Sequence, residues 1–326
     1  MQQVISFNIH NLVPQDWFSS VGENSVWISG YRMYRLSMYD LPNGPIHFDL
    51  HGVRVFLAYG SVSYLNSKAA TPMVNDDGTL TFSGGIGETQ SPVGAYLMLL
   101  LPFDKGGEPG DEKTTHARIS EVIGLLTAVN GRNMAFDYVF DYEYVLGIKQ
   151  DGTIERRVIG SVLQNPFVLP VPDISKKRLD FMTLVDSAIA IKPEPEGNRI
   201  SLALRWYQAA IFEDGVDAFV KLWIAIETIA MPDTTNIKPI ILVLARVYGL
   251  TQENAESRFQ IGRIFGLRGR IIHRGEQISP RIGLLEYLQA IFEDLFFDAV
   301  GQPTEKRIEN VLKNPKMPGV IDILQY

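Results

Sequence analysis

The sequence of 326 residues contains no cysteine. This absence excludes disulfide bonds, thiolate nucleophiles, cysteine zinc fingers and iron–sulfur clusters, and it fits a reducing compartment. Long apolar runs are also missing, since the longest, Ala95 to Leu101, has seven residues, against roughly 20 in a membrane-spanning helix. The first residues show no basic segment followed by an apolar core, so we expect no signal peptide. These absences predict a cytoplasmic protein without membrane association.

The net charge of −7 is distributed unevenly along the chain. Residues 1–173 hold 11 Lys/Arg and 18 Asp/Glu, whereas residues 174–326 hold 19 of each kind. Between Arg258 and Arg281 there are six arginines and one acid, Glu276. This arginine-rich segment is suited to hold phosphate locally, although the chain as a whole is acidic.

Periodicity predicts an α+β fold with two domains. Residues 1–170 contain β-rich stretches such as Phe136–Val145, together with hairpin turns and one helix over His116–Val129. They predict a mainly antiparallel β domain with one or two helices. Three prolines between Pro166 and Pro172 mark the boundary, and a period of 3.6 then predicts an all-α domain over residues 174–326. Its candidate helices span residues 175–190, 199–212, 215–230, 237–248, 252–273, 280–300 and 304–313.

Common cofactor motifs are absent. Gly84-Gly85-Ile86-Gly87 lacks the third glycine of a dinucleotide loop, and neither Gly-Lys-Ser/Thr nor Gly-x-Ser-x-Gly occurs. His47, Asp49 and His51 would share one face of a strand and could bind a metal. No fourth ligand is evident nearby, so the sequence favours an exposed polar face there. We therefore expect no cofactor and no metal.

The segment from Ile264 to Gly275 is the most informative part of the chain. It predicts an amphipathic helix that ends at a glycine, with His273 in the last turn beside several arginines. Such a helix end attracts an anion, and its imidazole can move a proton near neutral pH. Arg270 and His273 lie about 60° apart on a regular helix, whereas Arg268 and His273 lie about 140° apart. The second pair converges only if the last turn unwinds or a second subunit contributes, and spacing alone favours a structural role for the arginines.

Glu227 stands in the otherwise apolar segment Leu222–Met231. A carboxylate buried there needs a cation, because an unpaired charge is costly in an apolar surrounding. The partner is expected to be Arg205 or one of the six arginines between Arg258 and Arg281. Either Glu227 makes an ordinary structural ion pair, or it orients the arginine or histidine of a site.

Four residues separate Arg268 from His273, as in the R-x4-6-H signature of HEPN domains. Helices carrying Arg205-Trp206-Tyr207 and Leu222–Glu227 precede this motif. Over residues 175–313 the chain therefore resembles the Apea-like branch of the HEPN family. The resemblance implies a HEPN-like helical bundle that dimerises, with two motifs meeting in a cleft. It also implies a metal-independent endoribonuclease of the toxin or anti-phage defence type.

The resemblance further implies roles for individual residues. His273 would be the general acid or base, and Arg268 would stabilise charge on the reacting phosphate. Arg270 and Arg274 would bind phosphate. Glu227 would orient Arg268 or His273 without contacting the substrate. The expected partners are RNA, a second copy bound through the C-terminal domain, and a cognate regulator.

One alternative stays open from the sequence. Many active members of the family have a polar residue after the arginine, whereas this chain has Gly269. That difference favours a non-catalytic HEPN module for interaction or RNA binding. In either case the domain over residues 1–170 would act as a sensor or a recruitment module.

Overall fold

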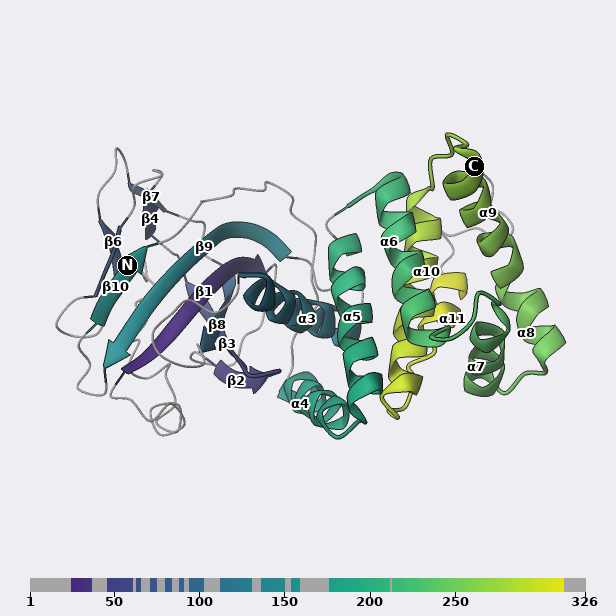
Figure 1. Cartoon of the computed structure of the whole chain (residues 1–326), viewed down its shortest axis with the longest axis horizontal. Coiled ribbons are helices and arrows are strands. Elements are labelled where there is room, and N and C mark those ends of the chain that lie inside the picture. Colours follow the sequence, from purple (N-terminus) through teal and green to yellow (C-terminus); the bar gives the residue numbers. More distant parts are fainter. Residues whose placement is uncertain are drawn as a thin grey trace. The chain divides into compact units, whose positions relative to one another are not determined.

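The computed structural model describes most of the helices and the backbone of the strands. The described residues are 25–36, 46–60, 63–65, 71–74, 80–83, 88–90, 94–102, 112–130, 136–149, 154–158, 176–211 and 213–313. Side chains are described for residues 49–53, 55, 117–130, 180–211 and 213–313. The chain divides into two compact units, Met1–Ile119 with Asn133–Asp180 and Ser120–Arg132 with Phe181–Tyr326. Figure 1 labels the elements of both units.

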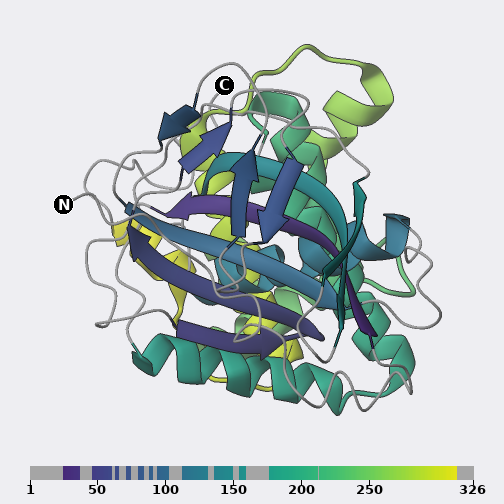
Figure 2. The same ribbon diagram turned by 90° about the vertical axis from the view of Figure 1, so that its left-hand side faces the viewer.

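The backbone of the first unit contains paired strands (Figure 2). They are β1 (Ser25–Leu36), β2 (Ile46–Leu50), β3 (Val53–Gly60), β4 (Ser63–Leu65), β5 (Thr71–Val74), β6 (Leu80–Ser83), β7 (Glu88–Gln90), β8 (Gly94–Pro102), β9 (Phe136–Lys149) and β10 (Ile154–Val158). Six of them pair in the order β10-β9-β1-β8-β3-β2. Strands β2 and β3 are joined by His51 and Gly52, whose φ angles of 49° and 70° are those of a tight hairpin turn.

The predicted α+β class, with an antiparallel β domain that has its own helix in residues 1–170, was wrong. Among the residues whose side chains are described, only Asp49, Leu50, Val53 and Val55 lie in strands, and all other regular elements are helical. An α+β domain needs a sheet that buries one face against its own helix. Local alternation indicates extended backbone but does not specify that partner layer. The described part of the chain is mostly helical, and residues 120–130 of the helix that we assigned to the β domain belong to the second unit.

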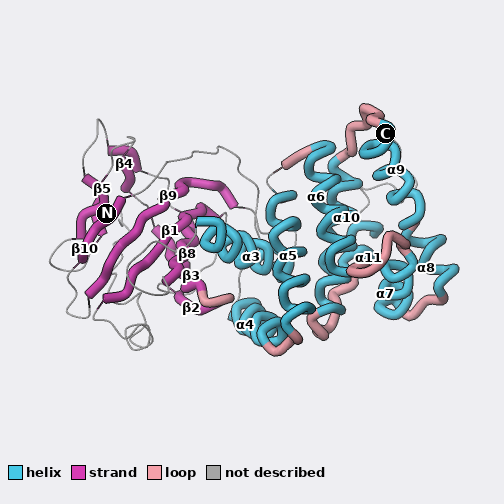
Figure 3. Tube along the Cα trace, viewed as in Figure 1, coloured by secondary structure: helices cyan, strands magenta, loops and turns pink. Residues whose placement is uncertain are grey.

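Helices form the second unit, which includes α3 from Ser120 onward and α4 from Phe181 onward (Figure 3). They are α3 (Glu112–Asn130), α4 (Lys176–Ala190), α5 (Glu194–Ile211), α6 (Gly215–Ala230), α7 (Lys238–Tyr248), α8 (Gln252–Phe259), α9 (Ile261–Arg274), α10 (Ile282–Ala299) and α11 (Arg307–Lys313). Helix α6 is the most apolar, and it packs between α5 and α10 with Phe219, Leu222 and Trp223 buried. The aromatic core continues across these helices, since the rings of Tyr207 and Phe292 stack 4.3 Å apart.

Helix α3 makes a close backbone approach to α5. A Cβ added to Gly124 would lie 2.4 Å from the carbonyl oxygen of Leu204, so only glycine fits at this position. Every residue from Val122 to Asn130 is buried. The end of the helix is also held, because the guanidinium of Arg307 donates hydrogen bonds to the carbonyl oxygens of Ala128 and Val129. Arg307 thus satisfies carbonyl groups that have no partner within their own helix.

Glu293 lies fully buried in the middle of α10. Its carboxylate accepts a hydrogen bond from the Tyr207 hydroxyl at 2.6 Å and lies 2.9 Å from Nη1 of Arg307. Burial raises the pKa of this carboxyl, while Arg307 and Tyr207 act in the opposite direction. The result is a buried ion pair that joins α10, α5 and α11.

The neighbouring Asp294, also on α10, binds the first turn of helix α11. Its carboxylate accepts hydrogen bonds from the backbone N–H groups of Arg307 at 2.9 Å and Ile308 at 3.2 Å, and from the Tyr248 hydroxyl. Burial raises the pKa of Asp294, and these three donors oppose that shift. Burial, together with the Asp294 carboxylate, likewise raises the pKa of Tyr248. From one turn of α10, these two adjacent acids therefore bind side chains or backbone of three other helices, α5, α7 and α11.

Candidate active site at the end of helix α9

The predicted catalytic residues lie on α9, whose two ends are sharply defined. The helix follows Gln260, which adopts the left-handed conformation with φ 55° and separates α9 from α8. It ends at Gly275, with φ 64°, whose N–H donates to the carbonyl of Arg270 together with that of Glu276. A glycine in the left-handed conformation directly after the last turn is typical of a helix C-terminus. It places His273 in the last turn, next to the exposed loop that leads to α10.

The structure brings Arg268 and His273 together within one chain. Nη1 of Arg268 lies 3.0 Å from Nε2 of His273. Helix α9 stays regular between them, so neither of the two conditions expected from the sequence is needed. The expectation failed because it considered only where the side chains leave the helix, whereas an arginine side chain is long enough to reach around it. Gly269, which lies between the two on the helix surface, adds no side chain to that path.

Glu227 on α6 completes the cluster. Its Oε1 lies 3.7 Å from Nη2 of Arg268, so one of the six arginines is its partner, as expected. Arg205 instead lies 3.5 Å from Glu121. Glu227 is not fully buried, since its side chain is 26% exposed and that of Arg268 is 23% exposed. At this distance the two charges attract without a direct hydrogen bond.

The contact between Arg268 and His273 constrains the state of the imidazole. A guanidinium has only N–H donors and no acceptor. The two nitrogens therefore make a hydrogen bond only when Nε2 of His273 carries no proton and Nδ1 carries one. His273 is exposed, so the same ring is open to a ligand. The arrangement combines a proton acceptor, a fixed cation and a supporting carboxylate at one accessible point.

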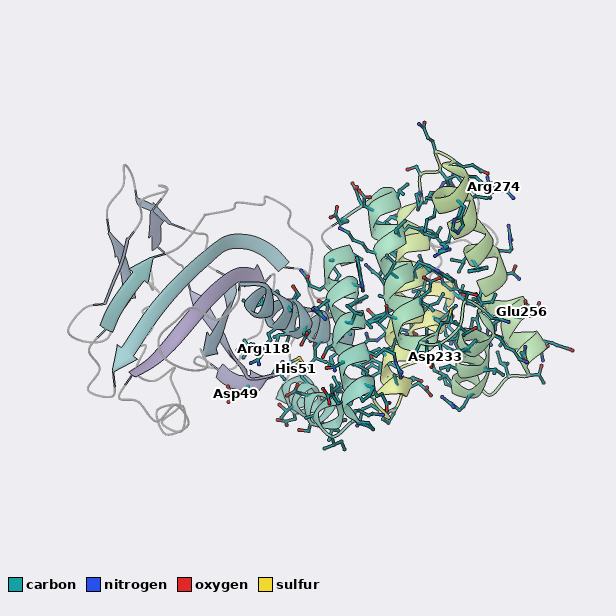
Figure 4. The ribbon with its side chains drawn as sticks, in the orientation of Figure 1. Asp49, His51, Arg118, Asp233, Glu256 and Arg274 are labelled. Carbon is teal, nitrogen blue, oxygen red and sulfur yellow. The ribbon has the colours of Figure 1, made fainter. Side chains whose placement is uncertain are left out.

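The two predicted phosphate-binding arginines differ in their surroundings. Arg270 forms an ion pair with Glu276 at 2.7 Å. Arg274 is exposed at the end of α9 and has no ion pair with any residue that the structure describes (Figure 4). Arg274 is therefore the more available of the two for an added anion.

The alternative of a metal face on β2, which the sequence disfavoured, requires an alternation that the structure does not show. Asp49 is exposed on the strand, but His51 lies beyond it in the hairpin turn, with φ 49° (Figure 4). A residue in a turn no longer follows the alternation of the strand. The side chain of His47 lies outside the described residues. No group of three metal-ligating side chains occurs among the residues that the structure describes.

The buried cluster of Glu293, Asp294 and Arg307 was missed by sequence reasoning. A signal was present, because two adjacent acids stand in the apolar run from Ala290 to Phe297. The same argument that singled out Glu227 applies to them with more force, since both are almost inaccessible. All their described partners are internal donors, so the cluster holds the fold together rather than facing a ligand.

Comparisons with known proteins add no relative. No family model matches the chain, no curated protein matches it, and no solved structure matches it. Of the helices described here, none combines the length and apolar character of a membrane-spanning segment.

Proposed function

We propose that this protein is a metal-independent endoribonuclease of the HEPN type, acting in the cytoplasm as a toxin or in anti-phage defence. The observation that carries the proposal is the 3.0 Å contact between Arg268 and His273 at an exposed helix end. The Glu227 carboxylate supports it from α6. Buried, internally satisfied side chains would have favoured a purely structural role, whereas this imidazole is accessible.

In the proposed reaction an RNA phosphate displaces His273 from Arg268. The guanidinium then binds the phosphate oxygens, and Nε2 of His273 is free to take the proton of the ribose 2′-hydroxyl. The 2′-oxygen attacks phosphorus, and the bond to the 5′-oxygen breaks as that oxygen receives a proton. Arg268 stabilises the negative charge that builds on the phosphate during this step. Glu227 keeps the guanidinium in place throughout.

A second proton-transfer group completes the chemistry. The leaving 5′-oxygen needs an acid while the 2′-hydroxyl needs a base, and one imidazole cannot serve both at the same instant. We propose that a second copy of the chain supplies the second histidine through a homodimer of the helical unit. A cognate regulator would keep this dimer inactive until it is needed.

The test is cleavage of varied RNAs in EDTA by the wild-type chain, Arg268→Ala and His273→Ala. Wild type is expected to cleave, and each variant is expected to lose about 10²-fold or more in rate, as for the loss of a general base or a charge-stabilising donor. Arg246→Ala is the matched control, because it removes an arginine from the exposed ion pair with Asp298. Equal rates for wild type and both site variants would refute the proposal.

The alternative is a non-catalytic HEPN interaction or RNA-binding module. It is favoured by the internal ion pairs of Arg268 with Glu227 and of Arg270 with Glu276. In that case RNA or a partner protein binds the wild-type chain, and no RNA is cleaved.

A further inference from the structure

Helix α9 has a face that carries almost no side chains. At about 100° per residue, Gly262, Gly266, Gly269 and His273 fall within an arc of about 60°. We call these four residues the glycine face. It lies about 160° around the helix from the buried residues Ile264, Leu267 and Ile271. The glycine face is therefore the side of α9 that points away from the core.

The described fold does not require two of these glycines. A Cβ added to Gly266 or Gly269 would meet no atom within 4 Å, and neither residue has a positive φ angle. Glycine destabilises the interior of a helix relative to alanine. The fold neither crowds nor strains these two positions, so it does not explain why the helix has glycine there instead of alanine. A molecule that approaches the helix backbone from outside would explain it, because it needs positions without side chains.

A row of arginines borders the glycine face. Arg263, Arg270 and Arg274 fall within an arc of about 40°, centred about 90° from the glycines. We call them the arginine stripe. Helix α9 contains four arginines and no acid. Arg263 is exposed like Arg274, and neither has an ion pair with a residue of the described part of the chain.

The dimensions of the stripe fit a polynucleotide strand. Arg263 and Arg274 are separated by about 16 Å along the helix axis. A stacked strand rises about 3.4 Å per nucleotide, so the stripe spans about five nucleotides. The carboxylate of Glu256 on α8 lies 3.8 Å from a Cβ added to Gly262, so it bounds the glycine face at the start of α9. Glu256 and Arg274, at the other end of α9, are labelled in Figure 4. This acid repels phosphate beside Gly262, so the strand would follow the arginine stripe from Arg263 and pass over Gly266 and Gly269 to His273.

We propose that the glycine face and the arginine stripe bind the backbone of one RNA strand of about five nucleotides and lead it to His273. Arg263 is the new phosphate contact, remote from the reacting bond. The inference rests on the proposed function for the identity of the strand as RNA. Phe265, the one aromatic residue of α9, is directed to Trp223, with ring centroids 6.1 Å apart. The surface therefore holds the backbone and does not select a sequence.

The first experiment measures binding without cleavage. A single-stranded RNA of about ten nucleotides, with 2′-O-methyl groups in place of the attacking hydroxyls, is titrated with the full chain by fluorescence anisotropy at several salt concentrations. Arg263→Ala is expected to reduce the slope of log K against log salt by about 0.7, the value for one phosphate contact on a single strand. Lys192→Ala is the matched control, because it removes one charge from the loop between α4 and α5, away from α9 (Figure 1). An unchanged slope for Arg263→Ala overturns the proposal.

The second experiment separates the glycine face from the stability of the helix. Gly266→Gln leaves the charge unchanged and introduces a better helix former. It is expected to raise or preserve the melting temperature while weakening RNA binding several-fold. Unchanged RNA binding by a folded Gly266→Gln variant refutes the role of the glycine face. A change in oligomeric state by size-exclusion chromatography, with RNA binding intact, assigns the face to a second copy and also overturns the proposal.

Two further measurements separate this inference from the proposed function. Cleavage of unmodified RNA is followed in parallel with binding. If Arg263→Ala reduces the salt slope but wild type cleaves no RNA, the proposed nuclease function is refuted and the proposed binding surface is supported. If cleavage requires His273 but Arg263→Ala leaves the slope unchanged, the nuclease function is supported and the binding surface is refuted. Polyglutamate that competes as well as RNA of equal length marks a general anion surface and overturns the inference.

Discussion

Arg307 is the residue whose loss should damage the helical unit most. It is buried, it lies 2.9 Å from the carboxylate of Glu293, and it donates to the carbonyl oxygens of Ala128 and Val129 at the end of α3. Arg307→Met keeps much of the side-chain volume but leaves Glu293 without its cation. Removing one partner of a buried ion pair costs about 3 to 5 kcal/mol. We therefore expect a loss of that size in the free energy of unfolding.

A double-mutant cycle tests the reasoning behind this magnitude. Replacing both partners of a buried ion pair by apolar residues is often close to neutral. Arg307→Met combined with Glu293→Met should therefore be more stable than Arg307→Met alone, with a coupling energy of about 1 to 3 kcal/mol. Recovery should stay incomplete, because the carbonyl groups of α3 still lack their donor and the Tyr207 hydroxyl loses its acceptor.

The assay is urea denaturation of the full chain, followed by the fluorescence of tryptophans that include the buried Trp223. Arg246→Met is the control, since Arg246 is 67% exposed in its ion pair with Asp298 and should cost less than about 1 kcal/mol. A cost below about 1 kcal/mol for Arg307→Met would contradict the argument. Strict additivity of the two stability changes in the cycle would also contradict it, since it would mean that Glu293 and Arg307 have no interaction energy.

Two other predictions concern single substitutions in the same unit. Burial raises the pKa of Glu293, so its stabilising contribution is complete below the unfolded value of about 4.3 and is lost as pH rises through the folded value. Wild type should therefore lose stability relative to Glu293→Gln as the pH rises above about 4 in urea denaturation, and a gain would show that Arg307 outweighs burial. Gly124→Ala should lower the melting temperature, because its Cβ would lie 2.4 Å from the Leu204 carbonyl oxygen and overpacking costs about 1 to 3 kcal/mol. An increase would instead show that α3 and α5 separate freely.

Several helices of the second unit could be located from the sequence. Helix α6 begins and ends where the spacing of apolar residues and the flanking breakers predicted, and α7 ends at Gly249 with a φ of 65°. Such ends are local, because a glycine adopts the left-handed conformation without strain. The start of α5 was placed five residues too late, since Pro195 is tolerated in the first turn and does not break the helix there.

The division between α8 and α9 could not be predicted. The periodicity indicated one helix over residues 252–273, whereas Gln260 interrupts it with a φ of 55°. A non-glycine residue in this conformation has no clear signal in a single sequence. The break matters for the site, because α9 begins as a separate helix at Ile261. Its direction, and therefore the set of its residues that faces the core, is independent of α8.

Residue chemistry and spacing along the chain were enough to select the residues of the candidate site, to predict the period of the helices and to predict that Glu227 needs a cation. Only the packing of helices α6 and α9 shows that Arg268 is the cation beside Glu227, and that Arg268 contacts His273 within one chain. Tertiary structure also decided that residues 120–130 of α3 belong to the helical unit. The physical reason is that helix period, caps and residue chemistry are local properties of the chain. The partner of a long side chain, or of a bare glycine, depends on which segments distant in sequence pack against it.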